Sequence, residues 1–331
     1  MNYRINYIDA LKGLAIILVV WGHIAEKSMG IENMPFNWMY GSFHMPLFIF
    51  LSGLFAYKGM DRISSKYIWH FLQKKAVRIL LPFIVVGGFY SVLVEHSFTA
   101  VLTGESSGYW FLPALFYCMV LGLFQRCLAV IWRGRIKDLI FFILVWGIAS
   151  LVWKAKLPVP YWLSALKMFP YFMAGHYFAQ YRLLSNGCLK KQCVQTAAIL
   201  FYILTIAVSI KTNFHFVSLT GIFAIVILLN LFATHSDVLP KWLSVVGKYS
   251  LEIYVLHWFF LPKMQDWGKY LLDQTSFNEN LILIAMVCSF VSAFIIAFCM
   301  IVAKVVKQSS MLDYLCFGVK KKKNNESFVH I

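Results

Sequence analysis

The first apolar segment of the chain, YIDALKGLAIILVVWGHI, contains three ionisable residues, Asp9, Lys12 and His23. Successive residues of an α-helix are rotated by about 100°, so Lys12 and His23, eleven positions apart, point in directions that differ by only about 20°. Asp9 falls within about 40° of His23 on the same projection. Along the helix axis, Lys12 lies about 16 Å from His23. The three side chains therefore form one polar stripe on an otherwise apolar helix.

Two kinds of chemistry fit this stripe. Ionisable side chains are costly within a membrane, so they usually face a cavity or one another. Asp9 and Lys12 can form an ion pair near the inner interface, with His23 as a hydrogen-bonded residue near the outer end. Alternatively, His23 can act as a general base, because imidazole exchanges a proton near neutral pH.

Two other apolar segments place polar side chains where they can meet the stripe. His44 lies at the outer start of FHMPLFIFLSGLF, so it can approach His23 at the same depth, although an interfacial position alone also explains it. The late segment VGKYSLEIYVLHWF contains Glu252, Tyr254 and His257. Tyr254 and His257 share a helix face, and Glu252 can neutralise a cation inside the bundle. A buried hydrogen-bonded network explains these three residues equally well.

A basic cluster, FLQKKAVRILLP, begins the third apolar segment. Lys74 and Arg78 are four positions apart and therefore share a helix face, with Lys75 next to them. Because lysine and arginine both bind phosphate well, these three residues are candidates for a clamp on the phosphates of a cytoplasmic cofactor. An ordinary enrichment of positive charge on the cytoplasmic side of a membrane explains the cluster too.

The elements that hold these residues are predicted to be membrane-spanning helices. Of the 331 residues, 60% are hydrophobic and only 13% are charged, whereas soluble domains carry about 25% charged residues. A helix needs roughly 20 apolar residues to cross a bilayer. The sequence therefore predicts an all-α, polytopic integral membrane bundle of about ten transmembrane helices. The predicted spans are residues 5–25, 41–57, 79–96, 110–130, 138–153, 162–181, 194–210, 215–234, 249–264 and 281–303.

Lysine and arginine predict the orientation of this bundle, because they are enriched in cytoplasmic loops. With the N-terminus in the cytoplasm, 22 of the 30 basic residues lie in inside segments and six in outside segments. This split predicts an N-in/C-in, multi-pass protein of the cell inner (plasma) membrane. The transmembrane domain is expected over residues 1–308 and a basic cytoplasmic tail over residues 309–331. We expect Lys320–Lys323 in that tail to bind anionic membrane lipid.

Nucleic-acid and metal sites are not expected. The net charge of +16 is compatible with nucleic-acid binding. However, the basic residues lie between apolar runs and form no soluble basic domain, so we expect no nucleic-acid partner. The seven cysteines are scattered without a CxxC pair, and the histidines lack the spacing of metal ligands, so no metal is expected.

Six segments together resemble a known family. They occur in the order DALKGLAIILVVWGH, FHMPLFIFLSG, KKAVRILLP, WFLPALF, FPYFMAGH and GKYSLEIYVLH. They resemble acyltransferase family 3, the bacterial membrane O-acyltransferases, and especially its fucose 4-O-acetylase-like branch, from Tyr7 to about His257. The resemblance implies a ten-helix membrane domain, with acyl-CoA as the cytoplasmic donor and a glycan hydroxyl as the acceptor.

The resemblance also implies roles for particular residues. The family has a basic residue followed eleven positions later by an essential histidine, and this pattern falls on Lys12 and His23. Many members have arginine where this chain has Lys12. The basic cluster of the family's third span falls on Lys74, Lys75 and Arg78.

The resemblance thus implies a membrane O-acetyltransferase that uses acyl-CoA, expected to be acetyl-CoA, and a hydroxyl of a cell-surface or lipid-linked glycan. A larger acyl group such as succinyl is an alternative. His23 is expected to deprotonate the hydroxyl directly, or else to form an acyl-histidine, while Lys12 or Asp9 orients groups or stabilises charge. The alternative function is a transporter that exports a glycan or lipid-linked intermediate. A transporter explains the spans and the intramembrane charges, but not the clustering of polar groups at both ends of the stripe.

Overall fold

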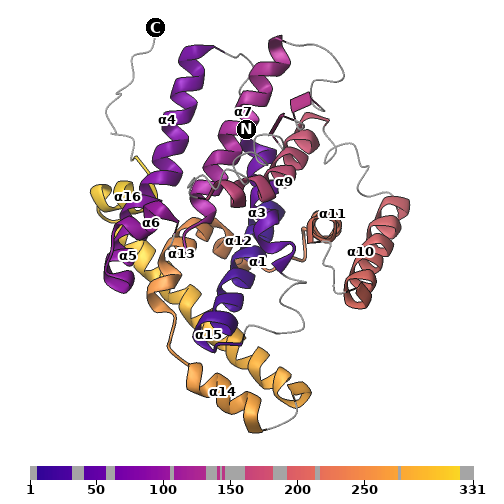
Figure 1. Ribbon diagram of the computed structural model, residues 1–331, viewed down its shortest axis with the longest axis vertical. Helices are drawn as coiled ribbons and strands as arrows, with labels where there is room; N and C mark the ends of the chain where they lie inside the picture. Colours follow the sequence, from indigo (N-terminus) through magenta and orange to yellow (C-terminus); the bar gives the residue numbers. More distant parts are fainter. Residues whose placement is uncertain are drawn as a thin grey trace.

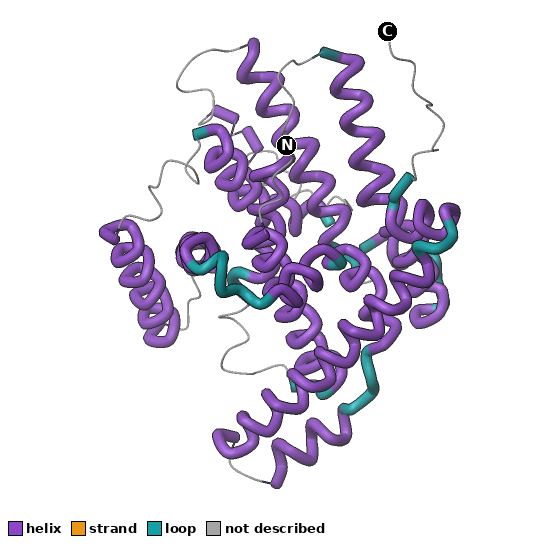
Figure 2. Tube along the Cα trace, turned by 180° about the vertical axis from the view of Figure 1, so that it is seen from behind, coloured by secondary structure: helices purple, strands orange, loops and turns teal. Residues whose placement is uncertain are grey.

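The computed structural model is helical throughout the part of the chain that it describes, and no strand occurs there (Figures 1 and 2). The described residues are 6–31, 41–56, 64–104, 108–131, 140–141, 144–145, 161–181, 192–212, 217–274 and 277–320. For these residues, the predicted all-α class is confirmed.

The helices differ widely in length, from single turns to a helix of 30 residues. The first half of the chain contains α1 (Asn6–His23), the π-helical turn η1 (Ile24–Ser28), α3 (His44–Ala56), α4 (Ser65–Pro82), the π-helical turn η2 (Phe83–Gly87), α5 (Gly88–Glu95), α6 (Thr99–Thr103) and α7 (Phe111–Ile131). The second half contains α9 (Trp162–Gln180), α10 (Gln192–Thr212), α11 (Val217–Thr234), α12 (Lys241–Lys248), α13 (Ser250–Leu256), the 3-10 turn η4 (His257–Phe260), α14 (Gln265–Gln274), α15 (Phe277–Val306) and α16 (Ser310–Phe317).

Five of the described helical stretches are long and apolar enough to cross a membrane. They are Tyr7–Ser28, Lys66–Glu95, Phe111–Leu128, Gln192–Ser209 and Leu281–Val306, and two shorter apolar helices are His44–Ala56 and Thr220–Thr234. All seven overlap predicted spans. The total of ten spans and the N-in/C-in orientation stay predictions, and the predicted span 138–153 lies mostly outside the described residues.

The third helix begins well before the predicted span at 79–96. Ser64 starts it, because its side-chain oxygen accepts a hydrogen bond from the backbone N–H of Tyr67 at 3.3 Å and so caps the first turn of α4. From there, α4, η2 and α5 form one continuous helical stretch up to Glu95. The basic cluster therefore lies within this long helix and not in the loop before it.

The predicted span 249–264 is not a single helix. The chain leaves helical geometry at Tyr249, between α12 and α13, and it becomes extended at Leu261 after η4. Short, interrupted helices within a membrane protein are tolerated where protein surrounds them. Here the break brings Glu252, Tyr254 and His257 into the interior, where all three are buried.

Helix α1 occupies the centre of the bundle (Figure 1). It contacts α3, α11, α12, α13 and α15. The contact with α12 is a close approach of two backbones, because a side chain at Gly13 would collide with the carbonyl of Leu243 and one at Gly247 with the carbonyl of Asp9. Small residues permit such approaches in membrane bundles, where packing rather than the hydrophobic effect holds helices together. The position of α12, and of α13 after it, is therefore tied closely to α1.

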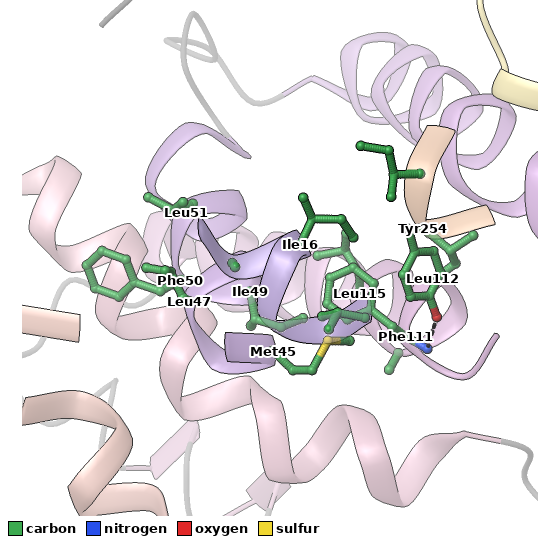
Figure 3. Close-up of a cluster of buried hydrophobic side chains, with 14 of the residues drawn as sticks. Ile16, Met45, Leu47, Ile49, Phe50, Leu51, Phe111, Leu112, Leu115 and Tyr254 are labelled. Carbon is green, nitrogen blue, oxygen red and sulfur yellow. Dashed lines mark hydrogen bonds between the residues drawn. The ribbon is translucent and has the colours of Figure 1, made fainter. Parts of the chain in front are cut away.

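Figure 3 shows a part of the buried apolar core in which residues of α1, α3, α7 and α13 pack together. Ile16 comes from α1, residues between Met45 and Leu51 from α3, and Phe111, Leu112 and Leu115 from α7, while Tyr254 comes from α13. Part of this cluster forms the wall of the cavity described below.

Candidate active site

Two histidines that are 234 positions apart in the sequence meet inside the bundle. His23 is the last residue of α1, and His257 is the first residue of η4. Their rings are parallel, with centroids 5.2 Å apart, and Nδ1 of His23 lies 2.9 Å from Nε2 of His257. His257 is completely buried. The pair therefore joins α1 to the late segment that contains Glu252, Tyr254 and His257.

The hydrogen bonds around this pair allow us to assign its tautomers. Nδ1 of His257 is 3.0 Å from the carbonyl oxygen of Ile253, which can only accept, so Nδ1 of His257 carries the proton. Nε2 of a neutral His257 then has a free lone pair, so it accepts a hydrogen bond from Nδ1–H of His23. This leaves the lone pair on Nε2 of His23. An imidazole held in that tautomer is ready to accept a proton.

Aromatic and basic side chains surround the histidine pair. The ring of Trp258 lies 4.5 Å from that of His23, and the ring of Tyr254 lies 6.0 Å from that of His257. Lys27 and His44 lie close enough to His23 to interact with it electrostatically. His44 is therefore near His23, as its position at the start of α3 suggested.

A cavity of about 350 Å³ opens between α1, α3, α4, α7 and α13. Most of its lining is apolar, including Ile16, Leu112 and Leu115, which Figure 3 shows side by side with Tyr254. Among the described residues, the charged side chains that line it are basic: Lys12, Lys75 and Arg78. An apolar cavity with a cationic cluster suits an elongated ligand that has an uncharged arm and an anionic end.

Lys12 thus belongs with the basic residues of α4, while His23 does not line this cavity. Nζ of Lys12 is 3.6 Å from Oδ1 of the buried Asp9, so the predicted ion pair within the stripe is present. Lys74 is exposed and does not line the cavity, whereas Lys75 and Arg78 do. The three basic residues of the cluster at the start of α4 are therefore not equivalent.

Tyr254 connects the cavity with the histidine pair. It lines the cavity, and its hydroxyl accepts a hydrogen bond from the backbone N–H of Phe111 at 3.3 Å. The same hydroxyl donates to the carbonyl of Gly108 at 3.1 Å. These two bonds tie the beginning of α7 to α13. The hydroxyl is fully engaged in this role, which makes Tyr254 a residue that positions the cavity wall.

Glu252 neutralises a cation, as the sequence suggested, but the sequence did not identify the partner. Its Oε1 is 2.6 Å from Nζ of Lys307, at the C-terminal end of the bundle, and its side chain is almost completely buried. The other oxygen, Oε2, has no hydrogen-bond partner among the described residues. The side chain of Glu252 therefore points toward Lys307, the residue that follows α15, and not toward the histidine pair.

Three residues of this region, Lys307, Trp258 and Phe317, were not found by sequence reasoning. Trp258 directly follows His257, and its proximity to the motif was a signal that could have identified it. Lys307 and Phe317 lie outside every motif, so their contacts with Glu252 and Arg78 could not be foreseen.

Together, the apolar helical bundle, the basic cavity and the histidine pair indicate a membrane protein with a candidate active site. The family model described as acyltransferase domain, of acyltransferase family 3, matches residues 5–302. The chain belongs to this family and is a membrane acyltransferase. No curated protein and no solved structure shows a significant match.

Proposed function

We propose that the protein is an O-acetyltransferase of the fucose 4-O-acetylase-like branch, in the inner membrane. It transfers the acetyl group of cytoplasmic acetyl-CoA to a hydroxyl of a cell-surface or lipid-linked glycan. The observation that carries the proposal is the hydrogen-bond chain from His23 through His257 to the carbonyl of Ile253, from which we infer the lone pair on Nε2 of His23. Transfer to a hydroxyl needs a proton acceptor of this kind, and an exporter of glycans does not.

The donor is proposed to bind in the basic cavity. Lys12, Lys75 and Arg78 line it and can form charge-assisted hydrogen bonds with the phosphate groups of acyl-CoA. The apolar walls accept the uncharged pantetheine arm. Tyr254 contacts both the cavity and the ring of His257, so the thioester is expected on the side of the cavity that Tyr254 closes. In this arrangement Lys12 binds the donor, and Asp9 balances its charge.

The reaction follows from the tautomer of His23. The acceptor hydroxyl oxygen attacks the thioester carbonyl carbon while its proton moves to Nε2 of His23. The resulting imidazolium is stabilised because its Nδ1–H remains hydrogen-bonded to the neutral ring of His257. The tetrahedral intermediate then collapses, the C–S bond breaks, and the departing thiolate of CoA takes the proton from His23. General-base assistance of this kind contributes about 10²–10⁴-fold in rate.

An acyl-histidine is the rival mechanism for the same site. In that case Nε2 of His23 attacks the thioester and carries the acyl group before the hydroxyl receives it. Both mechanisms need the free Nε2, so both predict that replacing His23 abolishes transfer. Trapping of acyl-labelled protein with acetyl-CoA in the absence of acceptor distinguishes them.

Mass spectrometry of the surface glycans of the host cell tests the proposed function. Wild type, a deletion and His23→Ala are compared, with the variant expressed at the wild-type level. Loss of the same ester-linked acyl group in the deletion and in His23→Ala supports the proposal, and its mass identifies the group as acetyl, succinyl or another acyl. An unchanged acyl pattern with reduced glycan export in the deletion would support the transporter instead.

A further inference from the structure

The C-terminal segment that follows the family domain contacts the basic cavity. The match to the family ends at residue 302, and α16 lies beyond it. Figure 1 shows α16 beside the end of α4 and next to α5 and α6. It contacts α4, η2 and α15. We refer to residues 307–318 as the C-terminal clasp.

The clasp binds one of the cationic residues of the cavity directly. Nη1 of Arg78 donates a hydrogen bond to the carbonyl oxygen of Phe317, the last residue of α16. Carbonyl groups at the C-terminal end of a helix lack partners within the helix and carry partial negative charge, so they attract a guanidinium group. Arginine has five N–H groups, so the others remain available to a ligand in the cavity.

A glycine allows α16 to end this close to α4. Gly318 has φ of 65°, in the left-handed region, and its N–H bonds to carbonyls of Asp313 and Tyr314 at the end of α16. A side chain at Gly318 would collide with the carbonyl oxygen of Val77. Any other residue there is therefore strained in conformation and too large for the contact with α4.

The other end of the clasp is attached to α13, a helix that also lines the cavity. Lys307 pairs with Glu252 at 2.6 Å and also lies over the rings of Tyr249 and Phe317, at 4.5 and 5.7 Å from their centroids. Glu252 is on α13, the helix of Tyr254 in the cavity wall. The clasp thus connects α13 with Arg78 on α4.

We propose that the C-terminal clasp is a positioning element that holds the guanidinium of Arg78 in place for the phosphate groups of the acyl donor. This inference rests on the proposed function, because it takes the basic cavity as the site of acyl-CoA. A hydrogen bond to a charged group that sets the orientation of Arg78 corresponds to about a tenfold effect on donor affinity.

The experiment measures the Kd of acetyl-CoA by calorimetry on the purified full-length protein in nanodiscs. The test variant is Gly318→Val, and Lys307→Met releases the other end of the clasp. Both are expected to raise the Kd about tenfold. Met311→Ala is the matched control, because Met311 is on the same helix but is 71% exposed. The Kd of this variant for acetyl-CoA should equal that of wild type. Thermal unfolding of each variant shows whether the bundle itself is intact.

A double variant separates positioning from general damage. If the clasp acts through Arg78, adding Gly318→Val to Arg78→Ala raises the Kd no further, because the group being positioned is already gone. An additive rise would overturn the proposal. The proposal would also be overturned if Gly318→Val had the Kd of wild type while Arg78→Ala had a raised Kd. That result would still support the basic cavity as the donor site. Absence of acetyl-CoA binding to the wild type would overturn the proposed function as well.

Discussion

Replacing His257 with phenylalanine tests the assignment of the catalytic tautomer. Phenylalanine fills a similar volume in this buried position but cannot accept the hydrogen bond from Nδ1–H of His23, now 2.9 Å long. A hydrogen bond to a charged group contributes about 1.5–3 kcal/mol, and the imidazolium of His23 forms only during the reaction. We therefore expect kcat to fall about 10- to 100-fold. Because His257 does not line the cavity, KM for acetyl-CoA should stay within about twofold.

The assay uses membranes that contain the natural acceptor and radiolabelled acetyl-CoA, and it measures ester-linked label at a series of donor concentrations. His235→Phe is a matched control. Nδ1 of His235 also lies 3.0 Å from a carbonyl four residues earlier, that of Leu231, but the side chain is exposed and belongs to no site. If His257→Phe keeps the wild-type kcat, the bond to His257 does not hold His23 for catalysis and the reasoning is wrong. A change confined to KM would contradict it in the same way.

Two further predictions concern the cavity and the helix contact behind the site. Lys75→Ala should raise KM for acetyl-CoA about tenfold, because it removes a cation of the proposed phosphate site, whereas Lys74→Ala should leave KM unchanged, since Lys74 is exposed outside the cavity. Steady-state kinetics on both variants checks this, and equal effects would refute the distinction between the two lysines. Gly247→Ala should destabilise the protein by about 1–3 kcal/mol, because the added methyl group collides with the carbonyl of Asp9. Gly41→Ala, where nothing lies within 4 Å, should not. Thermal unfolding in detergent measures the stability of both variants. Equal stability would show that α1 and α12 do not approach closely at Gly247.

The sequence predicted the features that depend on one helix at a time. The eleven-residue spacing placed Lys12 and His23 on one face of α1, and the interval of three placed Tyr254 and His257 on one side of the late segment. Helical periodicity fixes such relations without reference to the rest of the fold. The apolar composition likewise predicted an all-α membrane protein, because few structures other than helical bundles satisfy every backbone group in a bilayer.

Apart from the approach of His44 to His23, the sequence did not predict which helices meet. Lys12 lines a cavity with Lys75 and Arg78 of α4, and His257, which directly follows α13, reaches His23. These contacts depend on tertiary packing, for which helical periodicity holds no information. The early start of α4, in contrast, could have been predicted from the sequence, because serine is a recognisable N-cap residue and Ser64 directly precedes the helix.

The histidine pair depends on packing some distance away from it. His23 ends α1, while His257 follows α13, so the 2.9 Å bond between them holds only if α1 and α13 keep a fixed separation. That separation is set where α12 crosses α1 at Gly13 and Gly247, since α13 follows α12 after a single residue. A shift of α12 and α13 together by one ångström away from His23 would lengthen this bond beyond normal hydrogen-bond range. The two glycines carry no chemistry of their own, yet the orientation of the proposed base relies on them.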